Sequence, residues 1–167
     1  LAAVAVLRAV SQTTGQTLHI KWVNDLLLAG RKVCGILTEG IVQGDTLARS
    51  VIGIGLNTGP MRFPEELQDI AGTLHQPGRP VDREMLAARI ISGILAGIPH
   101  MPAHMDAYRT HCLTLGQQVC FQHEGRPRVG VAASIDDDGA LWVDTPEGPL
   151  HLVAGEISLR PRPPAGA

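Results

Sequence analysis

The chain has 167 residues, of which 44% are hydrophobic and 18% are charged, and its formal net charge is −2. This composition indicates a globular protein without the basic excess that favours nucleic-acid binding, and we expect no membrane-spanning helix. The three cysteines, Cys34, Cys112 and Cys120, are odd in number and show no paired spacing. We therefore expect a reducing, cytoplasmic location.

The first third of the chain predicts one helix followed by strands. Residues 1–11 carry apolar side chains at helical spacing, and Gly15 is a suitable C-terminal cap. Because this helix opens at Leu1 with neither a methionine nor a capping residue, we expect a further N-terminal part to precede it. The predicted strands cover residues 18–23, 25–28, 31–38 and 46–57, which favours a mixed or antiparallel sheet backed by helices.

Residues 25–28 and 31–38 form a predicted β-hairpin with Ala29-Gly30 as its two-residue turn. In this register Leu28 lies opposite Arg31, and Leu27 lies opposite Lys32. The strand period of two then places Asp25 on the same face as Lys32, as a diagonal neighbour.

Both lysines of the chain, Lys21 and Lys32, lie in this region, whereas the chain has twelve arginines. A carboxylate such as that of Asp25 keeps a neighbouring ammonium charged and aimed, which suits a lysine that meets an anionic ligand. An ordinary cross-strand ion pair on a solvated face is the alternative, since exposed pairs are common and contribute little stability.

The middle of the chain predicts a long loop and two helices. Residues 58–79 are rich in proline and glycine, with a short helix at residues 64–69. Asp82 is a suitable N-cap for the next helix, and another helix is predicted around residues 103–112. The apolar stripe of the helix that follows Asp82 consists of Leu86, Ala87, Ile90, Ile91, Ile94 and Leu95.

Short strands dominate the last third of the chain, and their number is typical of a small barrel. They are predicted at residues 117–122, 129–134, 140–143, 150–153 and 156–159. We therefore predict two domains, residues 1–114 and 115–160, and a frayed tail at residues 161–167. The predicted fold class is α+β, with a mixed sheet backed by helices and then a β-barrel.

Two polar motifs are considered as metal sites, and both lack the necessary ligands. His100 and His104 have i, i+4 spacing, but Pro102 lies between them and no further ligand accompanies them. Residues 136–139, Asp-Asp-Asp-Gly, lack the alternating ligands of a calcium loop and predict a hairpin turn instead.

Two further segments allow a binding role beside a plain structural one. Residues 53–57, Gly-Ile-Gly-Leu-Asn, place glycines in a strand that ends at Asn57, whose amide is able to pair with an adenine edge. Glu156 and Arg160 either form an ion pair at the edge of the barrel or bring the arginine to a phosphate.

Four segments in order resemble the biotin protein ligase family, the biotin–[acetyl-CoA carboxylase] ligases. Residues 21–25 (Lys-Trp-Val-Asn-Asp) are similar to the family's Lys-Trp-Pro-Asn-Asp signature, and residues 31–37 to its Arg-Lys-x-x-Gly-Ile-Leu segment. Residues 51–57 resemble its Gly-x-Gly-x-Asn strand, and residues 155–160 its closing Gly-Glu-[Ile/Val]-Ser-[Leu/Ile]-Arg segment. The resemblance runs over essentially the whole chain.

This resemblance implies a fold, a reaction and partners. The fold is part of a catalytic domain of the class II synthetase or biotin–lipoate ligase type, with a seven-stranded mixed sheet, followed by an SH3-like barrel. The reaction joins biotin to AMP with ATP and Mg²⁺, and then transfers biotin to a lysine of a carrier protein. The implied partners are the biotin carboxyl carrier domain of acetyl-CoA carboxylase and, in a homodimer, a second copy of the chain.

The resemblance also implies roles for individual residues. The implied catalytic residues are Lys32 and Asp25, and the implied biotin-binding residues are Lys32 and Gly35. The remaining assignments are Asn57, Glu156 and Arg160 for ATP or adenylate binding, and Lys21, Trp22 and Asn24 for support.

The chain departs from the family pattern in three ways. Val23 replaces the signature proline, and Thr38 stands where valine is usual. The family's Gly-Arg-Gly-Arg-x-Gly-Arg loop does not occur in this sequence, so we expect this chain alone to be deficient in forming biotinyl-AMP. A DNA-binding segment would also lie upstream, which leaves DNA binding open.

The alternatives are a lipoate-type ligase of the same fold and a non-catalytic module that binds biotin or a carrier domain. The closing segment at residues 155–160 argues against the lipoate-type ligase.

Overall fold

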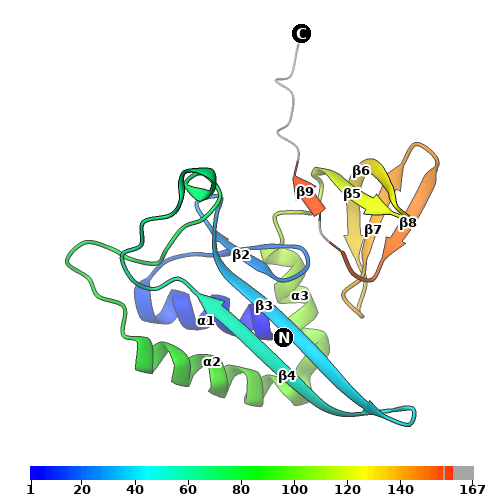
Figure 1. The fold of residues 1–167 in the computed structure, drawn as a ribbon. Coiled ribbons are helices and arrows are strands. Elements are labelled where there is room, and N and C mark those ends of the chain that lie inside the picture. The colour runs from blue at the N-terminus through cyan, green and yellow to red at the C-terminus, as the bar shows by residue number, and fades with distance from the viewer. Residues whose placement is uncertain (156, 160–167) are drawn as a thin grey trace.

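The computed structural model describes residues 1–155 and 157–159, which form two antiparallel sheets and a set of helices (Figure 1). The first sheet has the strand order β1-β2-β3-β4 and the second has the order β8-β7-β6-β5-β9. This arrangement confirms the α+β class. In the described residues the first sheet has four antiparallel strands, where the family resemblance implies seven strands in a mixed sheet.

Helix α1 (Ala2–Thr14) packs beside the first sheet and against α2. Its apolar spacing buries most of the helix, from Ala3 to Val10. It ends as the sequence predicts, because Gly15 adopts a left-handed φ of 72° and donates its N–H to the carbonyl of Ser11. Figure 1 shows α1 behind the sheet, with α2 running alongside α1.

The first sheet contains the predicted hairpin in the predicted register near its turn. Strands β2 (Asp25–Leu28) and β3 (Arg31–Gln43) pair Leu28 with Arg31 and Leu27 with Lys32. Strand β3 is longer than predicted, and it pairs along its length with β4 (Thr46–Leu56). The resulting β3–β4 hairpin extends well beyond the helices (Figure 1).

The predicted strand at residues 18–23 is too long. Strand β1 (His19–Lys21) ends at Lys21, and residues 22–24 form a turn that leads into β2. Lys21 pairs directly with Asp25 across this second, shorter hairpin. The middle residues of the signature, residues 22–24, therefore lie in a turn between two strands, and the Trp22–Val23 peptide bond within it is cis.

The helical region follows the predicted order with one difference in packing. A single 3₁₀ turn, η1 (Glu65–Leu67), interrupts the long loop, and α2 (Arg83–Gly97) begins after Asp82, whose side chain accepts the N–H of Met85 at 2.9 Å. Of the predicted apolar stripe, Leu86 and Ile90 are buried, whereas Ile91 and Leu95 are 59% and 64% exposed. The helix is therefore apolar over a wider face than its contact with α1 covers.

After α2 the chain continues through the 3₁₀ turn η2 (Ile98–His100) into α3 (Met101–His111). The combined helical segment Arg83–His111 is long and apolar enough to cross a membrane by length and composition alone, contrary to our expectation from the sequence. A single helix of this kind is a weak indication, because core helices and signal sequences meet the same criteria.

The second sheet, which is called the barrel below after its predicted form, contains the five predicted short strands. They are β5 (Gln118–His123), β6 (Arg126–Ile135), β7 (Leu141–Thr145), β8 (Gly148–Leu152) and β9 (Ile157–Leu159). Alternate residues such as Val119, Phe121, Leu141 and Val143 point inward and belong to the same hydrophobic cluster as the buried residues of α1 and β2. The two sheets therefore share one core.

Candidate functional site

An ion pair between Lys32 and Asp25 lies at the centre of the first sheet. The Lys32 ammonium is 2.7 Å from a carboxylate oxygen of Asp25, and the two side chains are 49% and 20% exposed. A bulge next to Leu26 shifts the hairpin register, so that Asp25 lies opposite Gly35. The predicted neighbours are still in contact despite this shift, and the lysine is more accessible than its partner.

Gly35 makes room for this ion pair. A Cβ atom at position 35 would lie 3.3 Å from Cε and 3.5 Å from Nζ of Lys32. The lysine side chain therefore crosses directly over the glycine backbone. Gly35, which the family resemblance implies for biotin binding, is thus in close contact with the side chain of Lys32.

A cavity of about 800 Å³ opens beside the ion pair. Its residues come from the first hairpins, from the end of β4, from the long loop and from β9. They include Lys21, Asp25, Lys32, Gly35, Gly55, Asn57, Leu67, Ile70, Ala71, Ser158 and Leu159. A smaller cavity of about 280 Å³ shares Lys21, Asp25 and Lys32 with it and adds the turn at residues 22–24, Gly155 and Ile157.

Two residues predicted from the sequence for support fix the turn between β1 and β2. Trp22 is 2% exposed and donates its indole N–H to the carbonyl of Gly139 in the barrel, at 2.9 Å. Its backbone N–H donates to the hydroxyl of Thr114. Asn24 donates its side-chain N–H to the carbonyl of Ile36 at 2.6 Å.

Helix α3 holds the same turn from another side. Tyr108 donates its hydroxyl to the carbonyl of Val23 at 2.8 Å. The turn is therefore attached to the barrel, to β3 and to α3, whereas Lys21 lines both cavities.

The predicted nucleotide-binding residues differ in how far the structure describes them. Asn57 lines the large cavity, and its side-chain N–H donates to the carbonyl of Gly72 at 2.9 Å. Glu156 and Arg160 lie outside the described residues. Their neighbours Ser158 and Leu159 line the large cavity.

Cys34 lines the large cavity but is chemically quiet. Burial raises the pKa of its thiol to about 12, and the negative charge of Asp25 adds to this effect. Because the thiolate is the nucleophilic form of cysteine, Cys34 is not a nucleophile at neutral pH.

Sequence reasoning missed the apolar part of the cavity wall. Leu67, Ile70 and Ala71 come from the long loop, and no periodic pattern distinguishes them from other loop residues. Among the described residues, no group of three or more His, Cys, Asp or Glu side chains is arranged to hold a metal ion.

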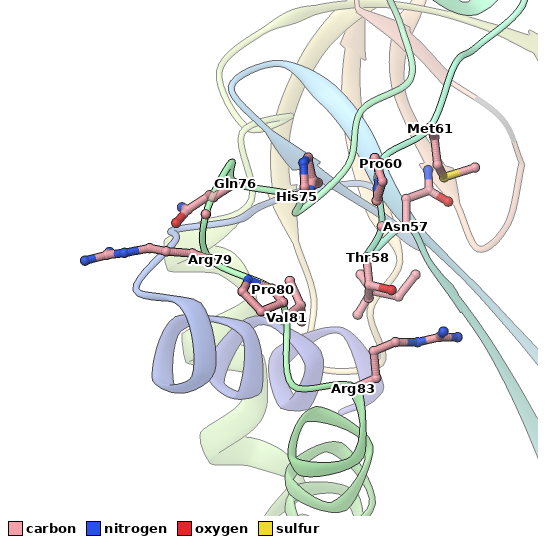
Figure 2. A pocket seen from close by; sticks show the side chains of 13 residues that line it. Asn57, Thr58, Pro60, Met61, His75, Gln76, Arg79, Pro80, Val81 and Arg83 are labelled. Atoms are coloured by element: carbon pink, nitrogen blue, oxygen red, sulfur yellow. The ribbon is translucent and has the colours of Figure 1, made fainter.

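Figure 2 shows a second large cavity, of about 660 Å³, next to the start of α2. It shares Leu56 and Asn57 with the first cavity but contains neither Lys32 nor Asp25. The side chain of Arg79 points away from the other labelled residues of its wall (Figure 2). We therefore assign the candidate site to the cavity that holds the ion pair.

The barrel turn that receives Trp22 is held by Asp136. Its carboxylate accepts a hydrogen bond at 2.7 Å from Nε2 of His151 and others from the N–H groups of Asp138 and Ala140. The bond from His151, followed by those from the backbone, lowers the pKa of Asp136 below its ordinary value.

We expect Asp136→Asn to lower the free energy of unfolding at neutral pH, because the ionised carboxylate makes these bonds in the folded state. A depressed carboxyl pKa contributes stability above its unfolded value, and this contribution is lost as the pH falls through the folded value. The difference between wild type and variant, measured by urea unfolding from pH 7 to pH 2, should therefore shrink below the ordinary pKa of an aspartate. A difference that stays constant over this range would contradict the role of the charge.

Two family models match the chain, one near each end. Residues 1–57 match the biotin/lipoate A/B protein ligase family, and residues 114–160 match the biotin protein ligase C terminal domain. The solved structure of the biotin protein ligase from Aquifex aeolicus in complex with biotin and ATP is similar, with a TM-score of 0.78 and 26% identity. That match covers 95% of this chain and 68% of the other.

Curated relatives agree with these matches. The bifunctional ligase/repressor BirA of Bacillus subtilis is 33% identical in an alignment of 167 positions. The alignment covers 95% of this chain and 51% of that protein. The biotin–[acetyl-CoA-carboxylase] ligase of Mycobacterium tuberculosis is 33% identical over 144 residues, which cover 83% of this chain and 52% of that protein. The chain thus spans about half the length of these relatives. Both family models, these relatives and the shared fold support the assignment of this chain to the biotin protein ligase family.

Proposed function

We propose that this chain carries the lysine site of an ATP-dependent biotin protein ligase, which forms biotinyl-5′-AMP and transfers biotin to a lysine of a carrier protein. The observation that carries the proposal is the Lys32–Asp25 ion pair at the cavity of about 800 Å³, which Asn57 also lines. The names of the relatives support the same reaction, and the Aquifex aeolicus relative was solved with biotin and ATP.

In the proposed first step, a carboxylate oxygen of biotin attacks the α-phosphorus of ATP. The new P–O bond forms as the bond to the bridging oxygen breaks, and pyrophosphate leaves with the electron pair. Because both the biotin carboxylate and ATP are anionic, negative charge accumulates on the oxygens around phosphorus during this step. The ammonium of Lys32 would offset this charge, and the carboxylate of Asp25, 2.7 Å from the ammonium, would hold it in position.

In the proposed second step, the amine of a carrier lysine attacks the carbonyl carbon of the biotinyl-AMP anhydride. An amide bond forms, AMP leaves with the electron pair of the broken C–O bond, and the amine releases a proton to solvent. The cavity reaches from Lys21 and Lys32 to Ser158 and Leu159 of β9, so the barrel borders the space in which the adenylate would lie.

Mg²⁺ belongs to the proposal as the counter-ion of ATP. Phosphate oxygens and water supply most ligands of Mg²⁺ in such sites, with one or two carboxylates from the protein. Asp25 is the carboxylate that lines the large cavity in the described part of the chain. The proposed acceptor is the biotin carboxyl carrier domain of acetyl-CoA carboxylase, and the homodimer stays a prediction.

Calorimetry on the chain tests the proposed function. We expect a non-hydrolysable analogue of biotinyl-5′-AMP to bind more tightly than biotin, because the cavity would hold both of its halves. Biotin-dependent release of pyrophosphate from MgATP would identify adenylation, and lipoic acid as a competitor would separate the two ligase types. Binding of biotin that MgATP does not affect would favour a non-catalytic module, and no binding of biotin or the analogue would contradict the proposal.

A further inference from the structure

The loop at residues 58–72 is attached directly to the backbone of Lys32. Lys32 donates its N–H to the carbonyl of Ile70 at 2.7 Å and accepts the N–H of Gly72 at 2.8 Å. Both backbone groups of this lysine are therefore bonded to the end of the loop. A Cβ atom at position 72 would lie 2.9 Å from Cβ of Arg31, so the close approach requires glycine.

The same end of the loop is bonded to Asn57, where the loop begins. Asn57 accepts the N–H of Leu74 at 2.8 Å, and its side chain donates to the carbonyl of Gly72. The first and last residues of the loop thus lie side by side, next to the part of the cavity wall formed by Leu56 and Asn57.

Thr73 closes this arrangement with one hydroxyl group. Its oxygen lies 2.6 Å from the carbonyl oxygen of Gly59 and 3.1 Å from that of Asn57, and it accepts the N–H of His75 at 3.2 Å. Because a hydroxyl carries one proton, it donates to these two carbonyls in turn or shares the proton between them. One side chain therefore connects both ends of the loop.

Few other contacts hold the loop in place. Leu67 and Ile70, which line the cavity, are 38% and 59% exposed, so burial of apolar surface fixes the loop only weakly. The hydrogen bonds at its two ends therefore have a large share in setting its position.

We propose that Thr73 is a positioning residue that holds the loop at residues 58–72 over the cavity and thereby sets the affinity for the nucleotide half of the ligand. The inference rests on the proposed function. The nucleotide half is the one affected, because the hydroxyl bonds to the carbonyl of Asn57. The part assigned to biotin is kept in place without the loop, since Asp25 holds the side chain of Lys32 and β2 pairs with its strand.

The test compares Thr73→Val, which keeps the shape of the side chain without its hydroxyl, with Thr73→Ser, which keeps the hydroxyl. In the chain without ligand, hydrogen exchange of the amides of Lys32, Gly72 and Leu74 should become about tenfold faster in the valine variant, the factor expected for one lost hydrogen bond. The serine variant should exchange like the wild type. Amides of β5 and β6 serve as an internal reference, and unchanged exchange in Thr73→Val would overturn the proposal.

The affinities for the two ligands distinguish the proposed positioning role from a merely structural role of Thr73. In Thr73→Val the affinity for the biotinyl-5′-AMP analogue should fall about tenfold, while the affinity for biotin should stay within about twofold of wild type. Equal losses for the two ligands would overturn the proposed role. If the wild-type chain bound neither ligand, the proposed function and the nucleotide role would both fall, whereas the exchange experiment would still decide whether Thr73 fixes the loop.

Discussion

Replacing Lys32 with alanine is expected to slow the formation of biotinyl-5′-AMP by about two to three orders of magnitude, the loss typical of removing one preorganised group that stabilises transition-state charge. The side chain is half exposed and paired with Asp25, so its removal should leave the fold intact. The measurement is biotin-dependent pyrophosphate release under single-turnover conditions, in a form of the protein that adenylates biotin.

Arg49→Ala provides the matched control. Arg49 lies opposite Ile41 on the exposed part of the β3–β4 hairpin, so its removal takes one positive charge from the same sheet but not from the cavity. Its rate should equal that of the wild type, and circular dichroism should show the same folded content for both variants. A Lys32→Ala protein that adenylates biotin at a near-normal rate would refute the catalytic assignment.

Replacing Trp22 with alanine is expected to lower the free energy of unfolding by about 3–5 kcal/mol, the usual cost of truncating a buried aromatic side chain. Trp22 is 2% exposed and bonds to Gly139 of the barrel, so the loss combines a cavity with a broken contact between the two sheets. Trp22→Phe should lower the free energy of unfolding by less, because it keeps an aromatic ring in the interior and loses mainly the hydrogen bond to Gly139. Urea unfolding followed by circular dichroism measures both variants.

Trp142 makes the comparison specific to position. It is 37% exposed on β7 and stacks on His151, with ring centroids 4.5 Å apart. The same substitution at Trp142 should cost much less than at Trp22, because less apolar surface leaves the interior. Equal losses at the two positions would show that Trp22 has no special part in joining the sheets.

The sequence was sufficient to predict the local geometry of the β2–β3 hairpin. A two-residue turn at Ala29-Gly30 fixes the register of the strands beside it, and that register brings Asp25 and Lys32 to one face. The bulge beyond Leu26 was not predictable, because the extra residue, Val33, is an ordinary strand residue and has no compositional signal of its own. The ion pair nevertheless forms, since the lysine side chain is long enough to cross Gly35.

Contacts between distant segments could not be predicted in the same way. The bond from Trp22 to Gly139 spans 117 positions, and the pairing of Lys32 with residues 70–72 involves backbone groups, which every sequence has. The loop residues that line the cavity lie outside regular helices and strands of any length, so no periodic pattern predicts that they face it. Lys32, Asp25 and Asn57, which the family resemblance implies for the site, line the large cavity, but only the structure shows how the loop and the barrel border it.

The turn between β1 and β2 joins the candidate site to three other parts of the molecule within four residues. Its successive residues are joined to different elements: Trp22 to the barrel, Val23 to α3, Asn24 to β3 and, at its end, Asp25 to Lys32. Because these residues follow one another along the backbone, a displacement of one of these contacts shifts the neighbouring ones. On the proposed function, a ligand that held Lys32 and Asp25 in place would also stabilise the contact of this turn with the barrel, and by thermodynamic reciprocity that contact would tighten ligand binding by the same factor.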